Sequence, residues 1–398
     1  MNGWRPIRVT SWAAASAAGL LLLTAPAMAG ASPRPAGGPP RISGVGKTLV
    51  ARWSGTSWKA VSAPSPGGSG ISRLYGVTAT SSGNAWAVGE YNPGVEYKSL
   101  VEHWNGTKWA QQTSPDPSSS DNFLAGVAAT SSGNAWAAGF YYTGTAYDSF
   151  IVHWNGTKWS KQTSPDPSSS ANSLSAVAVT SSTNAWAVGY YHHGSADQTL
   201  ILHWNGTKWA QQTSTDPGGS SHNNYLTGVT AVSASNAWAV GEYSNGTADR
   251  TLIEHWNGTK WSTETSPDAG GATDSNDLYA VAASSGSNAW AAGDYHTGGA
   301  DQTLILRWNG TKWATVTSPD PGGASANNDL YGVTAGSAST TWAVGDYFNG
   351  SKTVTLIEQW SGSTWSAVSS PNGSGSSDSE LFGVAVTSGT NAWAAGWS

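Results

Sequence analysis

Tyrosines with acidic neighbours recur along this chain at intervals of about fifty residues. The tyrosines are Tyr91, Tyr141, Tyr191, Tyr243, Tyr295 and Tyr347, and the acids close to them are Asp197, Asp249, Asp294, Asp301 and Asp346. An aromatic ring can stack on the C–H face of a sugar, and a planar polar group can fix its hydroxyls. The pattern therefore predicts carbohydrate-binding sites. In the alternative, the tyrosines cover a sheet edge and the aspartates cap loop amides.

A second polar series stands just before the segments that we expect to be innermost strands. Its asparagines are Asn122, Asn172, Asn224, Asn276 and Asn328, and charged residues occupy the next position in four repeats, at Arg73, Asp277, Asp329 and Glu380. If the repeats close into a ring, these residues form a polar channel mouth that holds a cation or a polar ligand. Ca²⁺ suits such oxygen ligands, but no calcium-loop spacing is present. Loop capping and ordered channel water are the alternative.

Few residues point to catalysis. The chain has no Cys, which excludes a thiolate nucleophile and a Cys-ligated zinc site. It also has no serine nucleophile elbow, P-loop or zinc motif. Four acids, Asp277, Asp294, Asp329 and Asp346, crowd two repeats and could serve a carbohydrate-active hydrolase or lyase. The recurring Ser/Thr-Pro-Asp segments predict turns. We expect a protein without catalysis or cofactor, and keep the hydrolase or lyase as an alternative.

A repeated β-structure must position all these residues. The motif W-x-G-x-x-W occurs seven times, starting at Trp53, Trp104, Trp154, Trp204, Trp256, Trp308 and Trp360. A second motif, close to Ala-Trp-Ala-x-Gly, is centred on Trp86, Trp136, Trp186, Trp238, Trp290, Trp342 and Trp393. A period near fifty residues with short apolar strands is typical of β-propeller blades. The sequence therefore predicts an all-β chain, a seven-bladed propeller of four-stranded antiparallel blades.

One repeat shows how a blade is expected to form. Its strands are predicted at residues 226–231, 237–243, 252–256 and 260–265. Asn257-Gly258 predicts a two-residue hairpin turn. That turn would pair Trp256 with Thr259 and place Trp256 and Trp261 diagonally on one face. The short turns should lie on one face of the ring and the long connections on the other, beside the channel.

Two further patterns predict how the blades join. In the second strand, Trp238 and Val240 alternate with Ala and Gly, so a bulky face can fill the space over the next blade's thin face. The N-terminal unit has only third and fourth strands, and the C-terminal unit has only first and second strands. These four strands are predicted at residues 48–53, 57–62, 381–386 and 391–396. They predict a two-plus-two closure of the seventh blade.

The first 46 residues predict export. Arg5 and Arg8, an apolar run densest at 17–23, and Ala27-Met28-Ala29 predict a signal peptide over residues 1–29. A Pro/Gly-rich linker over 30–46 and the propeller over 47–398 would follow. A membrane anchor is the alternative, although the apolar run is short for a span. Loss of the two arginines changes the net charge from −6 to −8, which argues against nucleic acid and anionic lipid as partners.

The repeat resembles that of BNR/Asp-box propellers, and most of all the branch of photosystem assembly-factor-like proteins. The similar segments are Leu-x-Gly-Val, Asn-Ala-Trp-Ala-Val-Gly, Thr-Leu-Ile-x-x-Trp and Lys-Trp, over residues 48–398. The resemblance implies the same order of strands in each blade. The hairpin departs from it, because W-N-G-T-K-W lacks the aspartate of an Asp-box. Sialidases share that superfamily, but Arg52 and Arg307 fall in third strands, so a three-arginine carboxylate clamp is hard to build.

These patterns together predict a secreted, extracellular, monomeric propeller. Retention at the cell envelope is an alternative location. The propeller has no membrane span once the leader is removed. Its function is predicted to be non-catalytic, multivalent carbohydrate binding through the long-loop face. An extracellular scaffold for cell-envelope proteins is the first alternative, and a carbohydrate-active hydrolase or lyase is the second.

Overall fold

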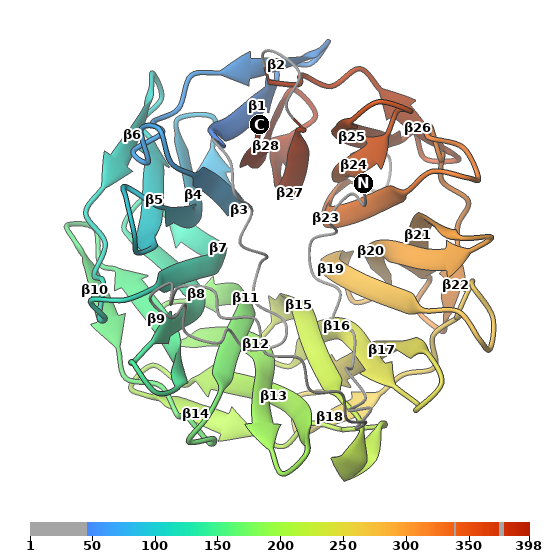
Figure 1. Ribbon diagram of the computed structural model, residues 1–398, viewed down its shortest axis with the longest axis horizontal. Coiled ribbons are helices and arrows are strands. Elements are labelled where there is room, and N and C mark those ends of the chain that lie inside the picture. Colours follow the sequence, from blue (N-terminus) through green and yellow to red (C-terminus); the bar gives the residue numbers. More distant parts are fainter. Residues whose placement is uncertain (1–45, 338–339, 374–377) are drawn as a thin grey trace, which may run out of the picture. The chain divides into compact units, whose positions relative to one another are not determined.

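Seven four-stranded antiparallel sheets follow one another around a central channel (Figure 1). This computed structural model describes residues 46–337, 340–373 and 378–398. The expected signal peptide and residues 30–45 of the expected linker lie outside the described residues. Gly46, the last residue of that linker, bridges to Ile71 in parallel. Among the described residues, no helix is long and apolar enough to cross a lipid bilayer.

Each blade runs from an inner strand at the channel to a short outer strand. Blade 1 is β3 (Ser72–Ser81), β4 (Asn84–Tyr91), β5 (Lys98–Trp104) and β6 (Trp109–Gln112). Blade 2 is β7 (Asn122–Ser131), β8 (Asn134–Tyr142), β9 (Tyr147–Trp154) and β10 (Trp159–Gln162). Blade 3 is β11 (Asn172–Ser181), β12 (Asn184–His193), β13 (Ala196–Trp204) and β14 (Trp209–Gln212).

The later blades repeat this order. Blade 4 is β15 (Asn224–Ser233), β16 (Asn236–Ser244), β17 (Asp249–Trp256) and β18 (Trp261–Thr263), preceded by a short 3₁₀ turn, η1 (Gly219–Ser221). Blade 5 is β19 (Asn276–Ser285), β20 (Asn288–Thr297), β21 (Ala300–Trp308) and β22 (Trp313–Thr315). Blade 6 is β23 (Asn328–Ser337), β24 (Thr340–Phe348), β25 (Thr353–Trp360) and β26 (Trp365–Val368).

Both ends of the propeller share the seventh blade, as predicted. Its strands are β27 (Glu380–Ser388), β28 (Asn391–Trp397), β1 (Thr48–Trp53) and β2 (Trp58–Val61). The C-terminal β28 pairs with the N-terminal β1 along its length, from Thr48 opposite Trp397 to Trp53 opposite Ala392. The fold class, the blade number and the two-plus-two closure are therefore confirmed.

The blades stack through tryptophan. Trp86 of β4 is fully buried and lies against Trp154 and Trp159 of the next blade, with ring centroids 5.1 and 5.2 Å apart. It shares a core cluster with Ala135 and Ala137, the thin face of that blade. Equivalent contacts recur up to Trp393, which lies against the third- and fourth-strand tryptophans of blade 1. Burial of these rings holds the ring of blades together without a disulfide.

The outer hairpin differs from the prediction. Trp256 lies directly opposite Trp261, so the turn contains four residues and the two rings face each other across the strands. Asn257 Oδ1 accepts hydrogen bonds from the N–H groups of Thr259 and Lys260, at 3.0 and 3.1 Å. Gly258 takes the positive φ of 94° that this turn needs. The asparagine side chain therefore supports the turn beside one backbone bond, from the Asn257 N–H to the Lys260 carbonyl at 3.3 Å.

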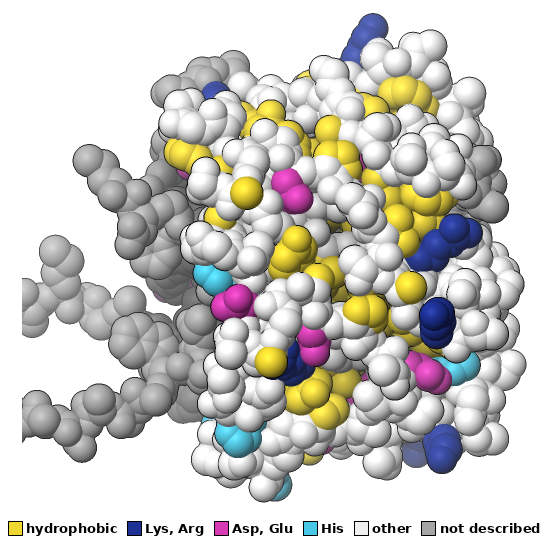
Figure 2. Space-filling model, turned by 90° about the vertical axis from the view of Figure 1, so that its right-hand side faces the viewer, with side chains coloured by type: hydrophobic (Ala, Val, Ile, Leu, Met, Phe, Trp, Pro, Cys, Tyr) yellow, Lys and Arg dark blue, Asp and Glu magenta, His cyan; other side chains and the backbone are white. Residues whose placement is uncertain are grey.

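The side of the ring drawn in Figure 2 carries few charges. Figure 2 shows hydrophobic groups between uncharged polar ones there, with isolated acidic and basic side chains. This matches the charged fraction of 11% in the whole chain. Within the blades, His103 stacks on Trp86 at 3.9 Å and bonds Asn84 through Nε2. The histidine therefore stabilises the pairing of the second and third strands within its own blade.

Candidate functional site

The long connections lie at one end of the channel, which we call the loop face. Each inner strand starts there and each second strand ends there, because the two are antiparallel. The six recurring tyrosines mark this end of the second strands, and each stands opposite the first residue of its inner strand. All six are half-buried. Each of the six packs against a core cluster of buried residues.

The five asparagines are the first residues of the inner strands, and do not precede them as expected. They are fully buried. Asn122 accepts the N–H of Ser118 and donates to the carbonyls of Ser118 and Ser120, within the loop that leads to its own strand. Asn172, Asn224, Asn276 and Asn328 do the same in their loops. Their side chains therefore hold the loops, and do not line the channel mouth.

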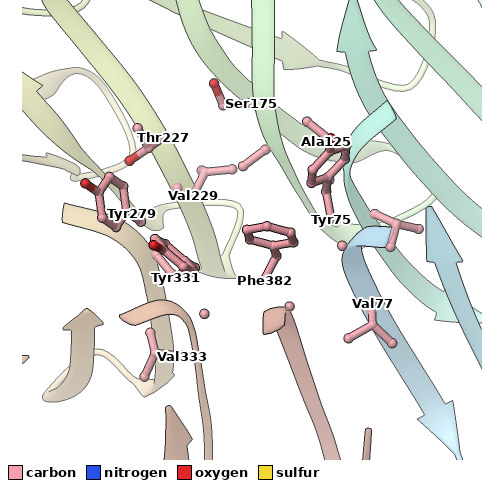
Figure 3. A pocket seen from close by; sticks show the side chains of 18 of the residues that line it. Tyr75, Val77, Ala125, Ser175, Thr227, Val229, Tyr279, Tyr331, Val333 and Phe382 are labelled. Atoms are coloured by element: carbon pink, nitrogen blue, oxygen red, sulfur yellow. The ribbon is translucent and has the colours of Figure 1, made fainter. Parts of the chain in front are cut away.

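A β-bulge in every inner strand turns one residue toward the channel. In blade 5, Leu278 and Ala280 pair with consecutive residues of β20, so Tyr279 between them is the extra residue. The bulge residues of the seven blades are Tyr75, Ala125, Ser175, Thr227, Tyr279, Tyr331 and Phe382. They line a cavity of about 230 Å³ (Figure 3). The prediction from sequence missed this row, because a bulge cannot be read from alternation.

The channel is asymmetric. Tyr75, Phe382, Tyr331 and Tyr279 come from four consecutive blades and form a continuous arc of rings, with neighbouring centroids 5.4, 5.4 and 5.5 Å apart. Small side chains, among them Ala125 and Ser175, line the opposite part of the wall (Figure 3). The aromatic arc therefore stands on one side of the channel.

A buried layer lies between this arc and the loops, and we call it the mouth row. It comprises the second residue of the inner strand in blades 1–6, the first residue of β27 in blade 7, and the cross-strand partner of each. The pairs are Arg73–Glu90, Phe123–Phe140, Ser173–Tyr190, Tyr225–Glu242, Asp277–Asp294, Asp329–Asp346 and Glu380–Trp397. Every member is buried. The acids expected at the channel mouth are thus present at that end, but they lie between the blades.

Burial controls the protonation of the mouth row. It raises the pKa of Glu242 well above its usual value, and the nearby Asp277 adds to this effect. It raises the pKa of Asp346 in the same way, with Glu380 and Asp329 contributing. The pKa of Glu380 rises to about 7, because desolvation outweighs the hydrogen bond from Trp397 and the charge of Arg73. Glu242, Asp346 and Glu380, in blades 4, 6 and 7, therefore resist ionisation.

Between neighbouring blades, three side chains meet at one place in this layer, which we call a niche. In the niche of blades 3 and 4, Tyr225 donates to Asp197 Oδ2 at 2.7 Å, and the Tyr190 ring lies edge-on to Tyr225 at 4.9 Å. The equivalent residues of blades 5 and 6 are Asp294, Asp301 and Asp329. Each can place one carboxylate oxygen within 4.8 Å of the other two, and all three residues are buried. Two tyrosines of one niche are therefore two aspartates in the other.

Histidines add to both niches, and the sequence prediction missed them. His192 Nδ1 lies 2.9 Å from Asp197 Oδ1, and His296 Nδ1 lies 2.9 Å from Asp301 Oδ1. The His192 side chain is 41% exposed, while its aspartate is buried. A comparison of blades 3 and 5 could have found the pair, because Tyr-His and Asp-Gln recur in both at the same spacing. Asp249, the third aspartate of this series, is half-buried at the start of β17.

Comparison with known proteins supports the fold. No family model matches the chain, and no curated relative matches it. Among solved structures it is similar to YCF48 from Cyanidioschyzon merolae, at 14% identity and a TM-score of 0.53 over 86% of this chain and 96% of that one. It is similar to YCF48 bound to D1 peptide at 14% identity and a TM-score of 0.52, over 85% and 93%. The chain is a seven-bladed β-propeller.

A carbohydrate-active enzyme gives a weaker structural match to this chain. The polysaccharide lyase PL25, an ulvan lyase, matches at 11% identity and a TM-score of 0.46, over 73% of this chain and 81% of that one. At such identities the likeness extends to the fold alone. The resemblance to photosystem assembly-factor propellers is therefore supported as a likeness of structure, and the ligand must be argued from this chain's own residues.

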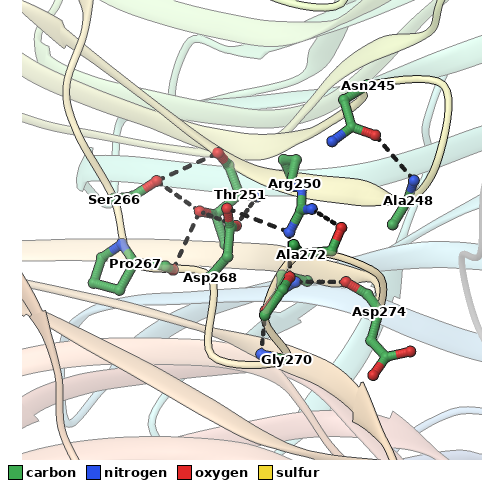
Figure 4. A network of polar contacts seen from close by, with 12 residues as sticks. Asn245, Ala248, Arg250, Thr251, Ser266, Pro267, Asp268, Gly270, Ala272 and Asp274 are labelled. Carbon is green, nitrogen blue, oxygen red and sulfur yellow. Dashed lines mark hydrogen bonds and ion pairs between the residues drawn. The ribbon is translucent and has the colours of Figure 1, made fainter.

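The Ser/Thr-Pro-Asp segments hold the loop face in place. Asp268 Oδ1 accepts the N–H and the hydroxyl of Thr251 in β17, at 3.0 and 3.1 Å (Figure 4). Arg250 lies 3.7 Å from Asp268 and donates to two carbonyl groups of the same loop. Equivalent bonds are made by Asp116, Asp166, Asp216 and Asp320. These aspartates fasten each long loop to the third strand, as a turn role requires.

Proposed function

We propose that the protein is a secreted, non-catalytic propeller that binds saccharides on its loop face, with its principal sites at blades 3 and 5. One observation carries this proposal. In both blades a partly exposed histidine, whose ring is held by a buried aspartate, directly follows a half-buried tyrosine at the end of the second strand. The residues are Tyr191, His192 and Asp197 in blade 3. Tyr295, His296 and Asp301 take the same places in blade 5.

Such a group suits a sugar for a physical reason. The histidine offers a ring nitrogen to a hydroxyl, and the tyrosine, on the other face of the same strand end, offers an aromatic surface to C–H groups. Asp197 binds Nδ1 of His192 and also accepts the hydroxyl of Tyr225, so the ring has a fixed orientation before the ligand arrives. Preorganisation lowers the entropy cost of binding. Two sites on one rigid ring raise the avidity for a branched or polymeric saccharide.

Burial favours binding over catalysis. A glycoside hydrolase or lyase needs acids that reach the substrate. Asp277, Asp294, Asp329 and Asp346 are buried between blades, at exposures of 3–5%. The proposal of export rests on the N-terminal residues alone, which lie outside the described part of the chain.

A glycan array with the purified chain tests the proposal, followed by calorimetric titration of the best ligand. We expect the double variant His192→Ala/His296→Ala to weaken binding about tenfold or more, as the loss of one to two hydrogen bonds implies. His222→Ala is the matched control, because His222 lies in a loop of the same face without a tyrosine–aspartate group. Equal affinity of both variants, or no glycan bound by the native chain, would refute the proposal.

A protein ligand is the second candidate. Val95, 79% exposed, lies in the connection after the second strand of blade 1, and Phe348, 41% exposed, is the last residue of the second strand of blade 6. Exposed apolar side chains on the loop face favour a polypeptide contact. The similar propeller YCF48 was solved with D1 peptide bound. Capture of cell-envelope proteins that is lost in the variant Val95→Ser/Phe348→Ser, and is unaffected by simple sugars, would favour this candidate.

A further inference from the structure

The niche between blades 5 and 6 gathers carboxylates from three strands. Asp294 comes from β20, Asp301 from β21 and Asp329 from β23 of the next blade. One oxygen of each lies within 4.8 Å of the others, although the three residues are only 3, 1 and 5% exposed. Oxygen ligands bound to one Ca²⁺ at 2.3–2.6 Å lie at or below about this separation from each other. The spacing therefore fits three ligands of a single cation.

The niche between blades 3 and 4 is an internal control. There the same three backbone positions hold Tyr190, Asp197 and Tyr225. The central Asp197 accepts a phenol hydroxyl at 2.7 Å, and the two rings contact each other. The fold thus fills this place elsewhere with one carboxylate and two uncharged rings. Replacement of both tyrosines by aspartate removes two rings and adds two carboxylates at the same backbone positions.

The acids on both sides of this niche supply a second, independent observation. Glu242 and Asp346 are buried, and Glu242 Oε2 and Asp346 Oδ2 accept no hydrogen bond within the described residues. Glu242 interacts electrostatically with Asp294, and Asp346 does so with Asp329. Buried carboxylate oxygens normally have a donor or a cation as a partner. Carboxylate oxygens that accept no hydrogen bond within the described residues therefore lie in blades 4 and 6, beside the three aspartates.

From this geometry we infer that Asp294, Asp301 and Asp329 bind one Ca²⁺ ion between blades 5 and 6. The hard carboxylate oxygens exclude metals that prefer nitrogen or sulfur. Ca²⁺ is favoured over Mg²⁺, because it accepts irregular oxygen sites, whereas Mg²⁺ demands an octahedron and gives up its water reluctantly. His296 fixes one oxygen of Asp301 at 2.9 Å, which orients that ligand. The inference does not rest on saccharide binding.

Terbium luminescence of the purified chain, freed of metal with a chelator, tests the inference. Tyr279 and Tyr331 interact electrostatically with the acids of this niche, so excitation of aromatic rings should sensitise Tb³⁺ bound there. We expect saturable luminescence that Ca²⁺ abolishes at concentrations about tenfold or more below those of Mg²⁺. Calorimetry with Ca²⁺ alone should give about one ion per chain, since one cluster supplies the ligands.

Variants at matched positions locate the ion. Asp301→Asn should weaken Ca²⁺ binding about tenfold or more, while Asp197→Asn, at the equivalent place in blade 3, should leave it unchanged. The double variant Asp294→Tyr/Asp329→Tyr rebuilds the niche of blades 3 and 4, and should fold and lose the ion. If the native chain binds no Ca²⁺ or Tb³⁺ between pH 6 and 8, protons neutralise the acids and the inference is wrong. Equal binding by Asp301→Asn or by the double variant also overturns it.

Discussion

A buried glutamate should make this propeller lose stability as the pH rises. Glu102 lies in the third strand of blade 1, where blades 2, 3 and 5 hold the buried apolar residues Val152, Leu202 and Leu306. Both of its carboxyl oxygens are buried and have no hydrogen-bond partner within the described residues. Desolvation raises the pKa of Glu102 from 4.5 to about 8. At neutral pH the native chain therefore keeps a proton that the unfolded chain releases.

The sign and size follow from proton linkage. An acid with a raised native pKa binds more protons in the native state, so stability falls between pH 4.5 and 8 and then levels off. At about 1.4 kcal/mol for each pH unit, the cost of Glu102 is about 1 kcal/mol at pH 5 and about 3 kcal/mol at pH 7. Above pH 8 it approaches about 5 kcal/mol. Glu102→Leu should recover these amounts, together with a pH-independent gain from apolar burial.

Urea unfolding followed by tryptophan fluorescence at pH 5, 7 and 8.5 measures the effect. Glu102→Gln should show the same pH dependence as Glu102→Leu, because both remove the ionisable group. The reciprocal variant Leu202→Glu is the control, and should introduce a similar loss at pH 7 into blade 3. If the gain from Glu102→Leu is the same at pH 5 and pH 8.5, the carboxyl is not forced to stay protonated, and the reasoning fails.

Three further changes test the packing and the loops. Trp186→Ala should cost about 3–5 kcal/mol in urea unfolding, because the ring is fully buried against the next blade; a cost below about 1 kcal/mol would contradict this role. Asp320→Ala should cost about 1–3 kcal/mol because Thr303 loses its acceptor, whereas Asp320→Asn should be nearly neutral, since Asn372 makes the equivalent bonds in blade 6. Deletion of residues 391–398 removes β28 and should abolish cooperative thermal unfolding, whereas a closure that is dispensable would leave it intact.

The architecture could be predicted because each blade repeats the same packing signals. Trp86 and its equivalents occur with small residues at fixed spacing, and the incomplete terminal units predict their own pairing. The local geometry of the turns was harder to predict. The Asn257 side chain bonds two N–H groups and enlarges the turn, so Trp256 and Trp261 face each other directly. A dipeptide signal cannot distinguish this turn from a two-residue one.

The site could be predicted only in part, because it too depends on local geometry. Asp294, Asp301 and Asp329 were each chosen from sequence, but in two separate groups, because their contact depends on the register of three strands in two blades. The bulge that presents Tyr279 to the channel leaves no mark in the alternation of residues. The asparagine series was conspicuous because it recurs, and recurrence here reflects loop capping.

Variation between the blades locates function better than repetition does. The second-strand tryptophans occur in all seven blades and hold neighbouring blades together. The mouth row uses the same backbone positions, yet it holds Phe123 with Phe140 in blade 2 and Asp277 with Asp294 in blade 5. Packing alone would favour apolar pairs throughout, since a buried carboxylate costs free energy unless something neutralises it. Packing does not account for acids in consecutive blades, and we propose that this part of the mouth row, rather than the repeated blade, carries the specific chemistry.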